Sequence, residues 1–134
     1  MTNNIITSGK RRTAVARAVL KQGKGLVRIN HIPIDLIEPR MSRLKLSEPL
    51  ILAGDIANSV DIDIDVVGGG ITSQAEASRL AIAKALIIFT KSDSLKETFL
   101  NYDRNLLVAD VRFKEPAKPN RHGQARSKVQ KSYR

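Results

Sequence analysis

A regular alternation of apolar and acidic residues constrains the possible folds of this chain most strongly. Residues 59–67 read Ser-Val-Asp-Ile-Asp-Ile-Asp-Val-Val. Successive side chains of a β-strand point to opposite faces of the sheet. The period of two therefore predicts a strand with its Val and Ile side chains in the core and its three Asp side chains in solvent or against a partner.

A long helix is predicted directly after this strand. Gly68-Gly69-Gly70 ends the strand, and residues 73–76, Ser-Gln-Ala-Glu, match the capping-box pattern that begins helices. Residues 74–89 then repeat apolar positions at helical spacing, and their many Ala side chains allow close approach to a sheet. A second capping-box pattern at 94–97 predicts a helix over 95–101, and the apolar run 106–111 predicts a last strand.

Turn signals divide the first 54 residues. Apolar and basic residues at 13–20 and 26–29 flank Gln22-Gly-Lys-Gly25, which predicts an antiparallel hairpin between these two segments. Prolines at 39 and 49 interrupt the segment 33–54, which predicts two or three short helical pieces. Asp35 and Ser47 are the predicted N-caps, and Gly54 is the predicted stop.

Composition excludes several classes of site. The length of 134 residues fits one domain. The absence of Cys excludes disulfides and thiolate chemistry, and two His are too few for a His-rich metal site, so no metal and no cofactor are expected. No stretch approaches the ~20 apolar residues that span a membrane. We expect an intracellular, soluble protein without a membrane partner.

The positive charge lies at the two ends of the chain. Net charge is +10, with seven Lys or Arg and no acid over 10–28, and seven against one Glu over 113–134, whereas residues 29–112 are slightly acidic. This distribution predicts a polyanionic partner, RNA above all. We divide the chain into a globular domain, 1–113, and an extended basic tail, 114–134, which has too few apolar residues to fold alone and is expected to become ordered on RNA.

Candidate RNA-binding residues come from both basic segments. A flexible cationic strand can follow phosphates and release counterions, and Arg can bind phosphate with two hydrogen bonds. The alternatives are a solubilising tail and a solvated strand edge. The candidates are Lys10, Arg11, Arg12, Arg17, Lys114, Lys118, Arg121, Arg126 and Lys128.

Two motifs invite an enzyme or metal interpretation. Gly68, Gly69 and Gly70 before a helix could contact a phosphate, as in small-molecule kinases, but the P-loop pattern is absent and a tight turn is preferred. The three Asp of the strand begin like a calcium loop, but Val66 stands where that loop needs Gly, so a solvated or Arg-paired face is preferred. His31 has no evident catalytic partner, and we predict no enzyme activity.

Several motifs together resemble one family. Residues 9–17 (Gly-Lys-Arg-Arg-Thr-Ala-Val-Ala-Arg), 68–86 (from Gly-Gly-Gly-Ile-Thr-Ser-Gln to Ala-Leu) and 103–112 are similar to the universal small-subunit ribosomal protein nine. The ending, Lys118 to Arg126 and then Gln-Lys-Ser-Tyr-Arg, resembles the archaeal and eukaryotic branch. Ser73 departs from the Gly of many members, and bacterial members usually end in Ser-Lys-Arg.

The resemblance implies a fold and a place. The fold would be α+β: a four-stranded mixed sheet with helices packed on one side, like the second domain of ribosomal protein five, plus an extended basic C-terminal tail. The chain would be a structural constituent of the small subunit of the cytoplasmic ribosome, acting in translation. It would bind the 3′ major domain of small-subunit rRNA in the head, beside neighbouring head proteins. The tail would reach P-site tRNA, with Arg134 on a phosphate and Lys131, Ser132 and Tyr133 helping to place it. A free-standing RNA-binding or RNA-chaperone protein remains the main alternative.

Overall fold

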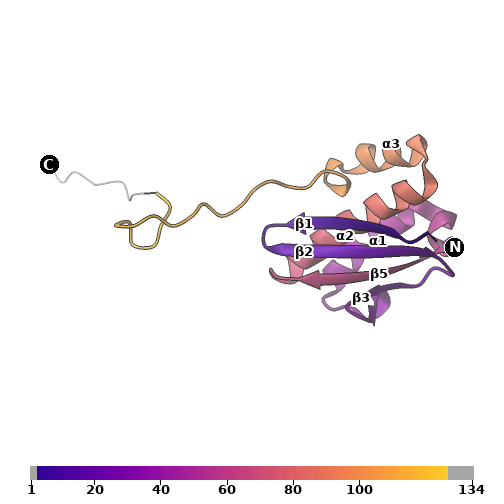
Figure 1. Cartoon of the computed structure of the whole chain (residues 1–134), viewed down its shortest axis with the longest axis horizontal. Helices are drawn as coiled ribbons and strands as arrows, with labels where there is room; N and C mark the ends of the chain where they lie inside the picture. The colour runs from indigo at the N-terminus through magenta and orange to yellow at the C-terminus, as the bar shows by residue number, and fades with distance from the viewer. Residues whose placement is uncertain (1–2, 127–134) are drawn as a thin grey trace.

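The computed structural model describes residues 3–126. It is an α+β fold with one mixed five-stranded sheet in the order β1-β2-β5-β3-β4 and with three α-helices. The helices lie on one side of the sheet, and an exposed chain leaves the body at one end (Figure 1). The strands are β1 (Ile5–Arg11), β2 (Ala14–Gln22), β3 (Val27–Ile29), β4 (Ile32–Pro33) and β5 (Val60–Val67); the helices are α1 (Arg40–Ala53), α2 (Ile71–Thr90) and α3 (Asp93–Tyr102), with 3-10 turns η1 (Ile34–Leu36), η2 (Gly54–Ser59) and η3 (Arg104–Leu106).

The number of strands differs from the four that the resemblance implied. The additional pairing is β4, a two-residue strand that pairs antiparallel with β3 at the sheet edge. Its second residue is Pro33, which has no N–H to donate to a further strand. The prediction of an α+β fold with helices on one side is confirmed, and the count of four is wrong.

The alternating strand is confirmed as the centre of the sheet. β5 pairs antiparallel with β2 and parallel with β3, so it has a neighbour along both edges. Its Val and Ile side chains at 60, 62, 64 and 66 are at most 5% exposed. The three Asp side chains point to the opposite face, as the period of two predicted.

The predicted hairpin between residues 13–20 and 26–29 is wrong. β2 pairs with β1, and β5 lies between β2 and β3. The reason lies in the glycine turn: the amides of Gly23 and Gly25 donate to the carbonyls of Ser59 and Val60 at 2.9 and 3.1 Å. The turn is therefore anchored to β5, and its two arms are held apart instead of pairing with each other.

Two helical pieces lie within residues 33–54, as predicted, but only the first, η1, is short. α1 runs for 14 residues through Pro49, which is buried. Ser47 is not an N-cap, because it lies inside α1 and its hydroxyl donates to the Arg43 carbonyl at 2.9 Å. Asp35 lies within η1, whose N-cap is Pro33. Gly54, at φ +62°, ends the helix as predicted.

Both capping-box predictions are also wrong in register. α2 begins at Ile71 with Gly70 as its N-cap, and the Glu76 carboxylate binds basic side chains of α1 and β1 instead of a helix amide. α3 begins at Asp93, and the hydroxyl of Ser92 accepts from the Leu95 amide at 3.5 Å. Residues 106–111 form no strand; η3 is followed by irregular chain.

β1 packs closely on α2, and this contact positions the basic residues 10–12 at the end of β1. A Cβ added at Gly9 would lie 2.0 Å from the Ala77 carbonyl oxygen and 2.9 Å from the Ala81 nitrogen. Beside this contact, the Thr7 hydroxyl donates to the Ala81 carbonyl at 2.8 Å. Only a residue without a side chain allows this approach, which accounts for the Gly at position 9. Among residues 3–126, no helix is both long and apolar enough to cross a membrane.

Candidate nucleic-acid interface

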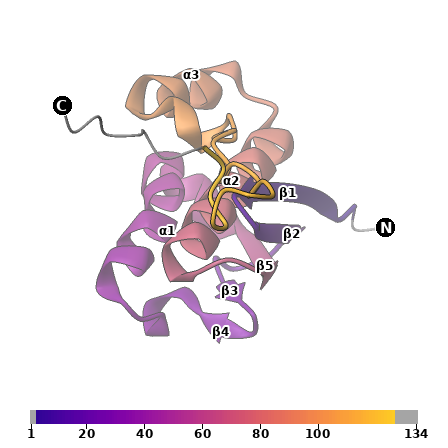
Figure 2. The ribbon, with the colours of Figure 1, turned by 90° about the vertical axis from the view of Figure 1, so that its left-hand side faces the viewer.

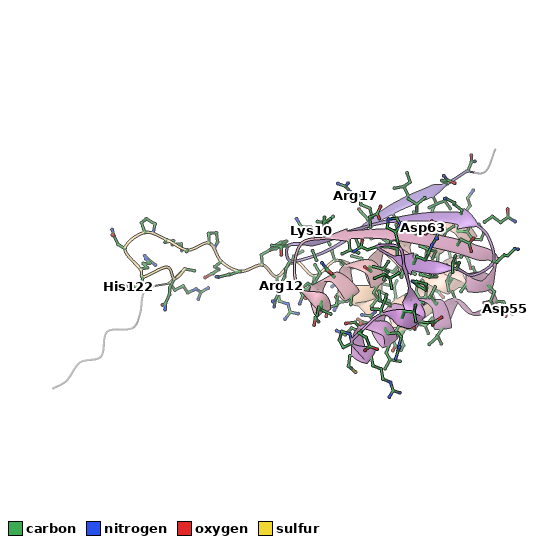
Figure 3. All side chains as sticks on the ribbon, turned by 90° about the horizontal axis from the view of Figure 1, so that it is seen from below. Lys10, Arg12, Arg17, Asp55, Asp63 and His122 are labelled. Carbon is green, nitrogen blue, oxygen red and sulfur yellow. The ribbon has the colours of Figure 1, made fainter. Side chains whose placement is uncertain are left out.

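The turn between β1 and β2 presents the first set of cations. Lys10 and Arg12 are exposed there, and Arg12 has φ +53°, in the left-handed region that tight turns use. Arg17 is exposed on the sheet face that the helices leave uncovered. Figure 3 shows Lys10 and Arg12 at the end of the body from which the tail leaves, and Asp55 at the far end.

Arg11 differs from its neighbours because it is already bound to two carboxylates. Its Nε donates to Glu76 Oε2 at 2.7 Å, and its Nη1 lies 2.7 Å from Asp110 Oδ2. The Arg11 side chain is only 14% exposed. Lys45 of α1 binds the other Glu76 oxygen at 2.9 Å. Burial opposes the ionisation of Glu76, but the hydrogen bonds from Lys45 and Arg11 outweigh it and lower its pKa.

The two basic segments meet at the root of the tail, residues 109–113, which directly precede it. The Lys10 ammonium lies 5.2 Å from the centre of the Phe113 ring, a cation–π contact. Residues 10 and 113 are more than a hundred positions apart in sequence. The contact brings the β1–β2 turn beside the start of the tail, so the two sets of cations can face one polyanion.

The described part of the tail is exposed chain with one closed loop. Lys114, Lys118 and Arg121 are exposed, and Arg126 binds Glu115 with two hydrogen bonds of 2.9 and 3.0 Å. The loop is closed by two backbone hydrogen bonds of 3.1 Å, from Lys118 to Gln124 and from Gln124 to Arg121. The predicted contacts at Lys128, Lys131, Ser132, Tyr133 and Arg134 lie outside the described residues.

The glycine run packs against the basic turn. Gly68 and Gly69 have φ of +78° and +68°, and a Cβ on Gly68 would lie 2.4 Å from the Thr13 carbonyl oxygen. This close contact supports the tight-turn interpretation, because the packing of the turn alone requires glycine at these positions. Gly70 is free of such contacts and caps the N-terminus of α2. The start of this helix, whose dipole favours anions, therefore lies beside the turn that carries Arg12.

Two of the three aspartates of β5 have structural partners, and the third lies opposite a basic residue in the sheet. Asp61 accepts hydrogen bonds from the amides of Lys24 and Leu26, each at 2.9 Å, and these two bonds, Leu26 first, lower its pKa. Asp63 accepts from Arg28 at 2.8 Å. Asp65 lies opposite Arg17 across the β2–β5 ladder. Within residues 3–126, no group of three or more acidic or His side chains could hold a metal ion.

Sequence reasoning missed a charged cleft of about 430 Å³ under the root of the tail. Its walls include Arg79, only 9% exposed, which binds Glu48 and, at 3.0 Å, Asp103. Burial alone would raise the pKa of Asp103. The hydrogen bonds from the Asn105 amide and from Arg79 lower it by more, so the pKa of Asp103 lies below its ordinary value. The partners of Arg79 come from α1 and from the end of α3, a pairing that no local pattern in the sequence reveals.

Comparison with known proteins identifies the family. Residues 9–134 match the family model described as Ribosomal protein S9/S16. Proteins named small ribosomal subunit protein uS9, from Methanococcus maripaludis and Methanococcus vannielii, are 54% identical over 129 residues, which are 96% of this chain and 96% of each relative. The resemblance seen in the motifs is confirmed, together with the prediction of a ribosomal protein and not an enzyme. The chain belongs to the ribosomal protein S9/S16 family.

Proposed function

We propose that this protein is part of the small subunit of the cytoplasmic ribosome, where it binds rRNA of the head, in the 3′ major domain, beside neighbouring head proteins. The relatives named small ribosomal subunit protein uS9 support the choice of subunit. The globular domain, 1–113, would provide the basic β1–β2 turn, and the tail, 114–134, would run along the RNA.

The observation that carries this proposal is the meeting of the two basic segments at Lys10 and Phe113. Other cations of the body are paired with carboxylates of the protein: Arg28 with Asp63, Lys45 with Glu76, and Arg79 with Glu48 and Asp103. The cations without an ion pair in the described chain include Lys10, Arg12 and Arg17 on the body and Lys114, Lys118 and Arg121 on the tail. These side chains can pair with phosphates without breaking an ion pair of the folded protein.

The roles of individual residues follow from this arrangement. Lys10, Arg12, Arg17 and the tail cations would neutralise phosphates, and the helix N-terminus behind Gly68, Gly69 and Gly70 could receive one more. At the end of the tail, Arg134 would contact a phosphate of P-site tRNA, with Lys131, Ser132 and Tyr133 placing it. A contact with phosphate alone does not depend on sequence, which suits a site that every tRNA must enter.

Sedimentation tests the assignment to the subunit. A cell extract is run through a sucrose gradient in high salt, and each fraction is probed for this chain. We expect the chain to stay with the small-subunit peak. A chain found only at the top of the gradient would instead indicate the free-standing RNA-binding or RNA-chaperone alternative.

Titration with salt tests the residues. Full-length protein is bound to a transcript of the 3′ major domain, and the logarithm of the association constant is plotted against the logarithm of the salt concentration. If all seven tail cations engage, the tail alone contributes a slope of about −5 to −6. Arg12→Gln should make the slope shallower by about one. Lys96→Gln, an exposed cation of α3 that removes the same charge, should leave it unchanged.

Truncation tests the tRNA contact. Removal of residues 132–134 should weaken retention of P-site tRNA by isolated small subunits and leave subunit assembly intact, because most cations of both basic segments remain. Filter binding of labelled tRNA and gradient profiles measure the two effects separately. Loss of assembly in this variant would contradict the assignment of these residues to tRNA.

A further inference from the structure

The segment that joins the body to the tail has few contacts of its own. Leu106 is fully buried, and the Val108 amide still donates to the Arg104 carbonyl at 3.1 Å. From residue 109 to 117 the described chain makes no backbone–backbone hydrogen bond. The side chains of Val111 and Phe113 are 83% and 54% exposed. Neither secondary structure nor apolar burial therefore explains why this segment lies against the body.

Ionic contacts from β1 hold it instead. Asp110 lies 2.7 Å from Arg11, and its side chain is only 17% exposed. Arg11 is in turn fixed by Glu76 of α2, which Lys45 of α1 also binds. One cluster of charges thus connects β1, α1 and α2 with the root of the tail. The Lys10–Phe113 contact follows three residues later along the same segment.

We infer that Arg11 and Asp110 form a clamp that positions the tail on the body for RNA binding, a proposal that rests on the RNA-binding function above. Arg11 then acts through Asp110 and not by direct contact with phosphate. In the free protein the clamp keeps residues 109–113 ordered, so binding does not have to restrict them. Ordering a free backbone on binding carries an entropy cost for every residue. Viewed from the tail side, the chain leaves the body beside β1 and α2 (Figure 2).

The neighbouring charges fit this role. Asp110 also binds Arg112 at 2.6 Å, and the hydrogen bonds from Arg112, with the nearby charge of Arg11, hold the pKa of Asp110 far below its ordinary value. Asp110 therefore stays ionised at neutral pH. An isolated carboxylate here would repel RNA, whereas a carboxylate paired with two guanidinium groups presents no net negative charge.

Two Asp→Asn variants separate positioning from net charge. Asp110→Asn breaks the clamp, and Asp55→Asn removes the same charge from an exposed residue of η2 at the far end of the body (Figure 3). Each variant makes the protein one charge more positive, which by itself favours RNA. We expect Asp110→Asn nevertheless to bind the 3′ major domain transcript about three- to tenfold more weakly than Asp55→Asn, or roughly 0.6–1.4 kcal/mol. Asp110→Glu, which keeps the charge, should restore most of the affinity.

A measurement without RNA tests the clamp itself. In full-length protein free of RNA, the 15N heteronuclear NOE of residues 109–113 should be lower in Asp110→Asn than in wild type, while the NOE values of β5 and α2 stay unchanged. Unchanged values at 109–113 would overturn the clamp, whatever the RNA result. A clear fall without any loss of affinity relative to Asp55→Asn would overturn its role in binding. Failure of wild-type protein to bind the transcript would overturn the RNA-binding proposal instead, and the NOE would still decide the clamp.

Discussion

The close approach of β1 to α2 makes Gly9→Ala a severe substitution. The new Cβ would lie 2.0 Å from the Ala77 carbonyl oxygen, so the strand must move at least about 1.4 Å away from the helix to reach ordinary contact. Such overpacking typically costs about 1–3 kcal/mol. The movement also stretches the hydrogen bond of 2.8 Å from Thr7 to Ala81, whose loss costs a further ~1 kcal/mol. We expect the free energy of unfolding to fall by about 2–4 kcal/mol.

Urea unfolding measures this loss, with Gly70→Ala as the matched control. No atom lies within 4 Å of a Cβ at Gly70 and its φ is −104°, so the control should change stability by less than about 1 kcal/mol. For m of roughly 1–3 kcal/mol per molar urea, a loss of about 2–4 kcal/mol should lower the midpoint of Gly9→Ala by about 0.7–4 M. Equal midpoints for the two variants would show that β1 can move at no cost, and would refute this account of Gly9.

Further predictions concern the ion pairs and the glycine turn. Because hydrogen bonds from Lys45 and Arg11 lower the pKa of Glu76 in the folded state, its contribution to stability is full above its ordinary value of 4.5 and is lost as pH falls. Glu76→Gln should therefore lose less stability between pH 5 and pH 3 than wild type, measured by thermal melts; parallel curves would count against this. Asp61→Ala removes the acceptor for the Lys24 and Leu26 amides and should lower the midpoint of urea unfolding, whereas Asp65→Ala, on the same face, should lower it less. Similar losses in both would mean that these amides do not depend on Asp61.

Local patterns predicted those elements whose signals are local. β5 follows from its period of two and α2 from its helical period, because each pattern reports the burial of a single element. β1 was not predicted, because Ser8 and Gly9 are weak strand formers and Gly9 is fixed by a contact with α2 about seventy residues away. The false hairpin has the same origin: which strand β2 pairs with depends on bonds from the glycine turn to Ser59 and Val60.

The candidate site was predictable to a similar degree. Composition located both basic segments, but it treated Arg11, Arg12 and Arg17 as equivalent. Tertiary structure separates them, since Arg11 binds Glu76 and Asp110 while Arg12 and Arg17 remain exposed. A run of basic residues in a sequence shows how many cations are present. Only the fold shows which of them are already paired with a carboxylate of the same protein.

The placement of β5 between β2 and β3 also has a consequence for how the chain folds. The β1–β2 hairpin can form from neighbouring residues, but the sheet is complete only after the 30 residues from 30 to 59 have passed and β5 has entered beside β2. Until then, the inner edge of β2 is an open row of unpaired backbone groups, to which another chain could pair. Arg17 and Lys21 stand on this strand, and their charges discourage such pairing. We therefore expect the pairing of β5 with β2 to limit the rate of refolding, because it joins residues far apart in sequence. Until β5 pairs, the charges of Arg17 and Lys21 keep other chains from pairing with β2.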